Sequence, residues 1–535
     1  MGRVYAILWL AMASSFHLLD WIIVAVYLVA MAGIGVYFSR RQTSLDQYLL
    51  ADRSMGWLPV GLSLMAALNS GMDYLMQPSS TIKYGFMLVL GIFSWVAIYP
   101  WVANVVFPFY HRLDFYTVYE YLEARFDVRV RTLAAGIFIL WRLGWMATAM
   151  YVPSLAINAV TGGQVDINTM TIVIGVLVTI TTMMGGIRGV IWTDVVQFFV
   201  MFGGLSATVW IVWDSVPGGL SEIWAVAASG GKLDFWPPLT DPAAAGGIDQ
   251  FTSFFTQPMT VVALMVALVV GRAAQYTSDQ VMVQRLRTTR SIKEARRAFV
   301  INAAGDALWT IGLSFVGLAL FAYFQRHALP SEYQTDKLLP YFMSLAFPAG
   351  AVGLVIAAIA AASMSSLNSA INSCSSVAVV DLYNRVWLGR EVRRGQHTEA
   401  EEHTQLRASR LFTALFGGLG TILAINVSRL GSLLEIANKL INAFTGPLFG
   451  IYILAMFCSR ARSEAVLAGG LAGALASYYV AYHGTIGFLR PSTFGLAATL
   501  AVGYLLALAW PAASTYPGRN LTWRAVMRPD PKHLG

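Results

Sequence analysis

The sequence predicts an all-α protein that crosses a membrane about thirteen times. Of its 535 residues, 57% are hydrophobic and only 12% are charged, whereas about 25% of the residues in a typical soluble domain are charged. Thirteen segments are long and apolar enough to span a bilayer, whose hydrocarbon core of about 30 Å needs about 20 residues of helix. A soluble enzyme is excluded, because this composition cannot supply enough polar surface.

The predicted segments follow one another from residue 18 to residue 511. The ninth is too long for a single crossing and should extend beyond the bilayer. The first 15 residues are either a cleavable signal peptide or an extension of the first helix, and the sequence leaves both alternatives open. The segments are 18–39, 55–78, 86–110, 132–159, 168–186, 189–213, 256–279, 298–324, 341–383, 406–426, 432–457, 463–483 and 491–511.

Lys and Arg residues are distributed unevenly between the two sets of loops. With the N-terminus outside, 26 of the 36 cations fall in inside segments, seven fall in outside segments and three lie within the membrane. Because cytoplasmic loops carry the excess of cations, the sequence predicts an external N-terminus and a cytoplasmic C-terminus. The charge of +8 is then explained by loops that face anionic lipid, so a nucleic acid is not an expected partner. Only two cysteines and short loops suit a bacterial plasma membrane.

Seven ionisable residues fall inside the predicted membrane segments. A charge at mid-bilayer costs at least about 2.5–3.5 kcal/mol, so each should face a cavity or a partner. One such residue could snorkel to the headgroups, but seven together are difficult to explain as passive structure. They are Asp73, Arg142, Asp194, Arg272, Asp306, Glu435 and Lys439.

Polar residues interrupt two of the segments at mid-depth. In the second segment, Asn69, Ser70, Gly71 and Asp73 break an otherwise apolar run, and the run 271–280 does the same in the seventh. Irregular backbone is tolerated in a bilayer only where it is buried in protein or lines a wet cavity. Because each interruption opens a set of five helices, the pair predicts an inverted-repeat transporter with its site near the midplane.

The ninth segment carries a stripe of small polar residues. Ser365 and Ser369 are four residues apart and share one helix face, with Ala362 and Ser366 beside them. Hydroxyls and free carbonyls that face a broken helix form an all-oxygen site, and neutral oxygens suit a monovalent ion such as Na⁺. The stripe could equally be a small-residue face for close helix packing.

Together these segments resemble the sodium:solute symporter family, whose members carry sugars, sialic acid or proline. The most specific piece is the run 185–197, Gly-Gly-Ile-Arg-Gly-Val-Ile-Trp-Thr-Asp-Val-Val-Gln, and the runs 119–126, 279–285 and 381–383 are also similar. The resemblance covers roughly residues 20 to 510 and is greatest to bacterial sialic-acid-type members. It implies a LeuT-like fold, in which two inverted five-helix repeats each begin with a discontinuous helix.

The resemblance also implies how the chain is divided. The expected parts are an N-terminal extension (1–17), a peripheral first helix (18–39), the first repeat (55–213), an extracellular loop (214–255), the second repeat (256–457), two peripheral helices (463–511) and a cytoplasmic basic tail (512–535).

A main sodium site between the second and ninth segments follows from the same resemblance. Its ligands would be the backbone carbonyls of Ala66, Asn69 and Ala362 and the hydroxyls of Ser365 and Ser366.

Some family members hold a second sodium ion. Its carboxylate would be Asp194, with Ser365 and Ser369 nearby. Asn368 stands where two-sodium members usually have Ser or Thr, although an amide oxygen can still coordinate Na⁺. The alternative for Asp194 is a structural carboxylate that caps or pairs near the start of its helix.

Family members bind solute with side chains from both broken helices and from neighbouring segments. Sialic-acid carriers hold the carboxylate with an Arg, and the matching position here is Trp145, with Arg142 three residues before it. The expected solute positions are Ser70, Asp73, Ile92, Arg142, Trp145, Arg272, Gln275, Asn438 and Lys439.

Asp73 and Arg272 leave two interpretations open. Asp73 could receive an amine while the planar fork of Arg272 clamps a carboxylate, so that the solute is a zwitterion such as an amino acid. Alternatively the two side chains neutralise each other as an ion pair. A small organic anion or a sugar held by Arg272 and Lys439 is the remaining choice, and the zwitterion is slightly favoured.

The expected function is sodium-coupled import of a small polar organic solute by alternating access. Na⁺ is the only cofactor expected, with no organic cofactor and no obligate protein partner. An enzyme is not expected, because no nucleophile–base pair or metal triad has recognisable spacing. The alternative is a transporter-like membrane sensor that acts with a separate signalling partner.

Overall fold

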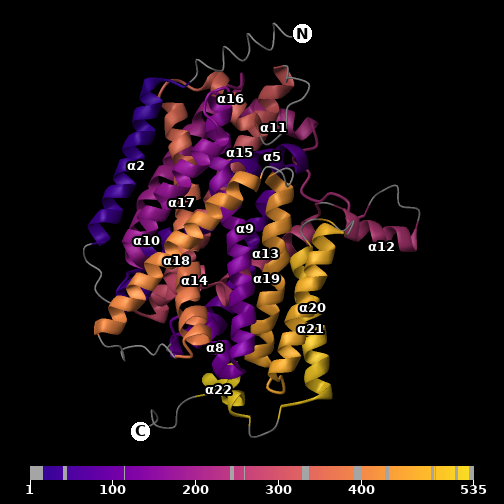
Figure 1. The fold of residues 1–535 in the computed structure, drawn as a ribbon. Helices are drawn as coiled ribbons and strands as arrows, with labels where there is room; N and C mark the ends of the chain where they lie inside the picture. Colours follow the sequence, from indigo (N-terminus) through magenta and orange to yellow (C-terminus); the bar gives the residue numbers. More distant parts are fainter. Residues whose placement is uncertain are drawn as a thin grey trace.

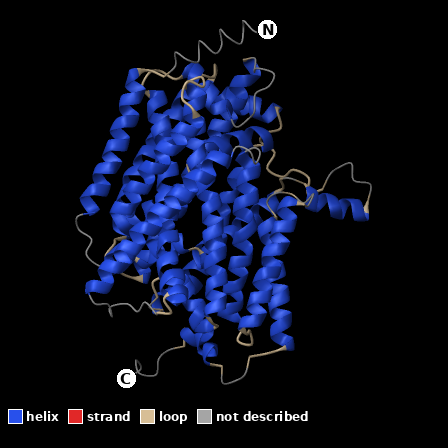
Figure 2. Ribbon diagram, in the orientation of Figure 1, coloured by secondary structure: helices blue, strands red, loops and turns tan. Residues whose placement is uncertain are grey.

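The described part of the chain is a bundle of helices without a β-strand. A computed structural model describes residues 16–39, 45–113, 115–240, 246–257, 259–327, 337–390, 399–427, 433–483, 487, 490–512 and 516–528. Figure 2 shows long helices running side by side, with short helices at both ends of the bundle. The predicted signal-like residues 1–15 lie outside the described residues.

The predicted thirteen crossings are found among these helices. Eleven described helices are long and apolar enough to cross a membrane, and the α4–α5 pair and α19 supply the other two. The elements are α2 (Leu18–Ser39), α3 (Leu45–Leu50), η1 (Ala51–Arg53), α4 (Trp57–Leu68), α5 (Gly71–Tyr84), η2 (Phe86–Ile92), α6 (Phe93–Trp101), η3 (Val102–Val106), α7 (Phe107–Arg112), α8 (Val118–Arg125), α9 (Val128–Val160), α10 (Ile167–Asp214), α11 (Gly219–Ser229), α12 (Gly247–Thr256), α13 (Val261–Ser278), α14 (Gln280–Arg287), α15 (Ile292–Arg326), α16 (Leu338–Ala346), α17 (Ala351–Val377), η5 (Ala378–Trp387), α18 (Glu399–Asn426), α19 (Leu433–Phe457), α20 (Ser463–Tyr482), α21 (Pro491–Ala509), η7 (Pro517–Leu521) and α22 (Trp523–Val526).

Both sets of five helices begin with a broken helix, as predicted. Asn69 and Ser70 separate α4 from α5 in an extended conformation. Asp279 alone separates α13 from α14, so the second break falls at the end of the predicted run 271–280 and leaves Arg272 inside α13.

The fifth and sixth segments follow each other within α10 as two spans, Ile167–Met184 and Gly186–Asp214, because the chain bends at Gly186, whose φ of 50° glycine adopts without strain. One predicted boundary differs from the structure. The predicted segment 341–383 is divided into α16 and α17, because the chain becomes extended at Phe347, the residue before Pro348, and the next helix begins only after Gly350, whose φ is 88°. From α17 the helix continues through the π-helical turns of η5, so a span longer than one crossing remains.

α17 is the central helix of the bundle, with every residue from Val355 to Val377 buried. It packs against α2, α4, α5, α9, α10 and α18, whereas α19, α20 and α21 pack together at one edge (Figure 1). The serine stripe is therefore enclosed by protein, and it faces the broken helix α4–α5 rather than lipid.

The peripheral helix α2 is anchored to this centre. The carboxylate of Asp20 accepts hydrogen bonds from the backbone amides of Gly350 and Gly353, at 2.9 and 2.6 Å. Asp20 thus caps the N-terminus of α17 from a neighbouring helix. A Cβ on Gly353 would lie 2.7 Å from the carbonyl oxygen of Asp20, so only glycine permits this approach.

Candidate functional site

The break between α4 and α5 is stabilised by its own side chains. Ser70 caps α5 by accepting a hydrogen bond from the Met72 amide at 3.2 Å, and Asp73 accepts one from the Ser70 amide at 2.6 Å. This reciprocal capping satisfies the amides of the restarted helix. The carbonyls at the end of α4 have no following helical turn and are left free for other partners.

The oxygens predicted for the main sodium site lie together at this break. The Ser365 hydroxyl contacts the carbonyl oxygens of Ala66 and Ala362, at 2.5 and 3.0 Å. The Ser366 hydroxyl contacts the carbonyl oxygen of Asn69 at 3.0 Å. All five residues are buried. The structure thus brings together neutral oxygens from the end of α4 and the middle of α17, a donor set that suits a monovalent cation.

One neighbouring oxygen was missed by the sequence analysis. The Ser366 hydroxyl also contacts the carbonyl oxygen of Ala67, at 3.2 Å. Backbone carbonyls carry no sequence signal, so only the position of the helix break could have indicated this residue.

The predicted second sodium site contains a guanidinium. Asp194 accepts hydrogen bonds from the Ser63 hydroxyl at 2.6 Å and from Arg285 at 3.0 Å. Arg285 also donates to the hydroxyl of Ser369, and both charged side chains are fully buried. Because the guanidinium lies against Asp194 and Ser369, the charge of the carboxylate is balanced within the chain. The structural alternative for Asp194, a carboxylate that pairs with a neighbour, describes this arrangement.

Asn368 is directed to another helix. Its side-chain oxygen accepts hydrogen bonds from Thr182 at 2.7 Å and from Thr181 at 3.4 Å. Both threonines lie on α10, so this amide already serves the packing of α10 against α17.

The alternative in which Asp73 and Arg272 pair with each other is not found among the described residues. Arg272 pairs with Asp306 at 2.8 Å, and its guanidinium lies over the Trp95 ring at 4.1 Å. Trp95 also donates to Asp306, at 2.6 Å. The carboxylate of Asp73 instead accepts a hydrogen bond from the backbone amide of Ser70. This amide has no helical partner, because the helix is broken at this residue.

Arg142 has a charged partner within the protein, whereas the polar group of Trp145 has no hydrogen-bond partner among the described residues. Arg142 forms a buried ion pair with Asp279, the residue at the second helix break. The indole nitrogen of Trp145 is buried and makes no hydrogen bond within the described part of the chain. Trp145 is therefore the predicted solute residue whose polar group most clearly lacks a protein partner.

The remaining predicted solute positions are less defined. Ile92 ends η2 and Gln275 lies in α13, and both are half-buried. The backbone of α19 runs through Asn438 and Lys439, but the side chains of these two residues lie outside the described residues.

Two residues central to this region were not predicted as site residues. Arg285 lies beyond residue 279, where the predicted seventh segment ends, so the sequence does not place it inside the membrane. Asp306 was recognised as an intramembrane charge, but the sequence could not show that it would pair with Arg272, 34 residues away.

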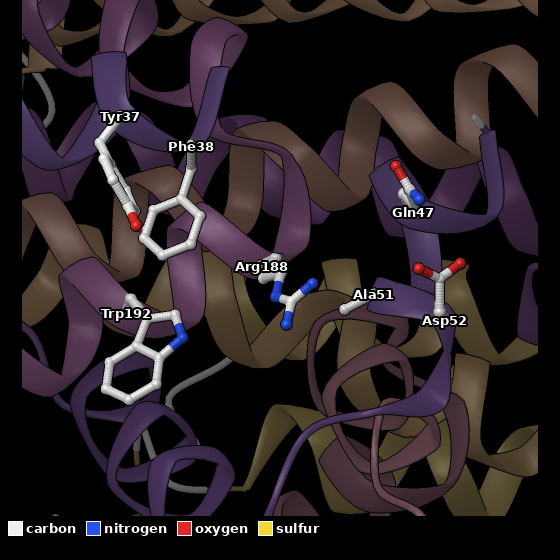
Figure 3. Close-up of a pocket in the computed structure, with 7 residues that line it drawn as sticks. All are labelled: Tyr37, Phe38, Gln47, Ala51, Asp52, Arg188 and Trp192. Atoms are coloured by element: carbon white, nitrogen blue, oxygen red, sulfur yellow. The ribbon is translucent and has the colours of Figure 1, made fainter. Parts of the chain in front are cut away.

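A separate cavity of about 280 Å³ lies where α2, α3, η1 and α10 meet. Figure 3 shows Arg188 in its centre, with the rings of Tyr37, Phe38 and Trp192 on one side and Gln47 and Asp52 on the other. Ala51 and Asp52 have positive φ angles of 48° and 54°, which non-glycine residues rarely adopt. No predicted sodium or solute residue lines this cavity.

Comparison with known proteins decides the family of the chain. The sequence model of the sodium:solute symporter family matches residues 48–473. The chain belongs to this family.

Relatives of the family are found in bacteria and in animals. The sodium/sialic acid symporter NanT of Aliivibrio fischeri is 32% identical over 92% of this chain and 94% of its own length. The sodium-coupled monocarboxylate transporter 1 of Homo sapiens is 30% identical over 87% of this chain and 74% of its own.

The solved structure of a substrate-bound, outward-open Na⁺-coupled sialic acid symporter has a similar fold. It superposes with a TM-score of 0.81 at 30% identity and covers 93% of this chain and 99% of that one. The LeuT-like fold and the coupling to sodium are therefore confirmed for this member of the family, and its relatives are membrane transporters.

Proposed function

We propose that this symporter imports a small organic acid together with Na⁺, which binds among the oxygens of Ala66, Asn69, Ala362, Ser365 and Ser366. The observation that carries the proposal is the convergence of two serine hydroxyls on carbonyls freed by the helix break. Neutral oxygens from two different helices form a site that exists only while those helices are together. A cation bound there would favour that conformation.

The class of solute is inferred from the relatives. Their names refer to sialic acid and to monocarboxylates, which are both organic acids. The expectation of a zwitterion is not supported, because Asp73 caps α5 and Arg272 pairs with Asp306 instead of standing free to clamp a carboxylate. We therefore propose an organic acid in place of an amino acid.

The geometry links the two ligands. The break that supplies the Na⁺ oxygens also places Ser70 and Asp73 at the start of α5. Na⁺ bound between α4 and α17 would hold this start in place for the solute. By thermodynamic linkage, the solute must then increase the affinity for Na⁺ by the same factor. An inward membrane potential supplies about 2.3 kcal/mol per charge per 100 mV.

The proposal is tested by uptake into proteoliposomes. The purified protein is reconstituted, and uptake of labelled sialic acid and of labelled lactate is measured with an inward Na⁺ gradient and with an equal K⁺ gradient. We expect accumulation of an organic acid only with Na⁺. Competition by neutral sugars and amino acids should be weak, and accumulation of an amino acid instead would contradict the proposed class of solute.

A pair of serine variants tests the ion site separately. Ser365→Ala removes an oxygen that contacts two carbonyls and should lower the apparent Na⁺ affinity at least about tenfold, equivalent to about 1.4 kcal/mol. Ser375→Ala is the matched control, because Ser375 lies on the same helix as Ser365 but donates to the Ser409 carbonyl of α18, away from the break. Equal Na⁺ dependence of the two variants would remove Ser365 from the ion site.

The alternative of a membrane sensor is not favoured. The relatives are named as symporters and transporters, and the family matches over most of the chain.

A further inference from the structure

Arg490 is a buried cation that has no ion-pair partner among the described residues. It directly precedes α21, is only 7% exposed, and its guanidinium lies over the rings of Phe254 and Phe255, at 5.0 and 5.3 Å from their centres. Neither terminal nitrogen makes a hydrogen bond within the described part of the chain. A buried guanidinium that lacks an acceptor is unfavourable, so an anion from outside the chain would be favoured here.

Arg490 lines a cavity that is otherwise almost entirely apolar. The cavity has a volume of about 190 Å³ and lies between α12, α13 and α21. Val262 and Val266 form part of its wall and are 39% and 41% exposed on α13, a helix that is apolar enough to span the membrane. The cavity therefore faces the hydrocarbon, and an occupant should combine an anionic group with an apolar chain.

The short helix α12 indicates that the cavity between α12, α13 and α21 lies near the membrane surface. It projects sideways from the bundle near the end of α21 (Figure 1). Ile248 and Phe251 on α12 are exposed, at 84% and 68%, and the Gly487 amide ties the helix to α21 by donating to the Phe255 carbonyl at 2.9 Å. Exposed apolar residues on a helix beside the bundle are typical of helices that lie among lipid headgroups.

We propose that the cavity between α12, α13 and α21 binds an anionic phospholipid, with the phosphate on Arg490 and one acyl chain beside Val262 and Val266. The charge of Arg490 and the N-terminus of α21 both favour a phosphate. The apolar wall favours a lipid over a free anion, because an acyl chain can fill the cavity by van der Waals packing whereas a free anion would leave the apolar wall without a matching partner. On the positive-inside prediction, this lipid belongs to the external leaflet.

Lipid binding to the intact protein tests the site. The detergent-purified chain is titrated with phosphatidylglycerol, phosphatidylcholine or glycerol 1-phosphate, and binding is measured by native mass spectrometry and thermal unfolding. We expect saturable stabilisation by phosphatidylglycerol alone. Arg490→Gln should weaken that binding about 10- to 100-fold, because charge-assisted hydrogen bonds are lost, while Arg490→Lys should keep most of it.

Two further variants keep the test decisive. Lys83→Gln removes an exposed cation that does not line the cavity, and it should bind phosphatidylglycerol like the wild type. Ala497→Phe fills the exposed side of the cavity while keeping Arg490 and should lose the lipid even if Arg490→Gln does not fold. Undiminished binding in Arg490→Gln or Ala497→Phe would overturn the proposal, as would equal stabilisation by glycerol 1-phosphate or phosphatidylcholine.

Discussion

Arg285 places a positive charge where a second sodium ion was predicted. Its guanidinium contacts both Asp194 and Ser369, and neither Arg285 nor Asp194 is exposed. A sodium ion at this point would meet a carboxylate whose charge is already balanced, next to a like charge in a medium that screens weakly. We therefore expect transport coupled to the main site, with Asp194 and Arg285 serving as a structural pair between α10 and α14.

Removal of one member of this pair should be more damaging than removal of both. Asp194→Asn leaves Arg285 buried without its counter-charge and is expected to lower the free energy of unfolding by about 3–5 kcal/mol. The double variant Asp194→Asn/Arg285→Gln should recover most of this loss. Thermal unfolding of the purified variants measures both effects. A single variant as stable as the wild type would show that the pair does not support the fold.

At the scale of elements, the approach of α5 to α17 depends on the absence of a side chain. A Cβ on Gly71 would lie 2.6 Å from the Ile359 carbonyl oxygen, which belongs to the rigid backbone of α17. The same helix carries Ser365 and Ser366 one to two turns further on. The distance between the two helices, and with it the arrangement of the oxygens proposed to bind Na⁺, thus depends on a glycine.

Gly71→Ala should therefore separate α5 from α17 and weaken Na⁺ binding. We expect a raised half-saturating Na⁺ concentration and reduced Na⁺-driven uptake in proteoliposomes. Gly136→Ala is the matched control, because no atom lies within 4 Å of a Cβ built at that helical position. It should be neutral or stabilising by up to about 1 kcal/mol. Unchanged Na⁺ dependence in Gly71→Ala would show that the contact is not needed for the ion site.

At the scale of the whole molecule, an ion-pair network joins the two repeats at one end of the bundle. Glu123 on α8 pairs with Arg131 of the first repeat at 2.8 Å and with Arg385 of the second at 2.5 Å. Arg131 in turn pairs with Asp381 on η5, at 2.6 Å. Because alternating access moves one group of helices against another, a network that crosses between the repeats should stabilise the conformation in which it is closed.

The network should make stability depend on pH in the acid range. Burial alone would raise the pKa of Glu123, but hydrogen bonds from Arg385 and Arg131 outweigh it and hold the pKa below its ordinary value. A carboxylate with a lowered pKa stabilises the fold above its unfolded pKa of about 4.3, and this stability is lost as the pH falls through the folded pKa.

Glu123→Gln should accordingly unfold at a lower temperature than the wild type between about pH 5 and pH 8, and the difference should shrink below about pH 4.3. Thermal unfolding at a series of pH values measures the difference. Glu464→Gln is the control, because its pair with Arg129 is exposed and contributes little. A difference that stays constant on acidification would show that the charge of Glu123 is not responsible.

The crossings and the broken helices could be predicted because they depend on local composition. Long apolar segments mark the spans, and the polar residues Asn69 and Ser70 mark the first break. The individual oxygens that face the serine stripe were predicted from the family resemblance. They are backbone carbonyls, which every residue has, so the sequence by itself does not identify them.

The partners of the buried charges could not be predicted in the same way. Asp73 was the acid considered for Arg272, whereas its partner in the structure is Asp306, and this choice depends on the rotation of α13 relative to α6 and α15. Arg285 lay beyond the predicted end of its segment, since a half-helix that restarts after Asp279 has no apolar run of membrane length. These contacts depend on tertiary geometry, and a single sequence contains no measure of it.

The cap that Asp20 places on α17 restricts how the central helix can move during transport. A piston-like slide of α17 along its own axis would pull Gly350 and Gly353 away from the carboxylate and uncover two amides in a buried place. Tilting of the other helices about the α2–α17 pair leaves both hydrogen bonds intact. The peripheral helix α2 thus restrains the central helix α17. We expect α2 and α17 to move together, as one rigid unit, while the other helices tilt around them during the transport cycle.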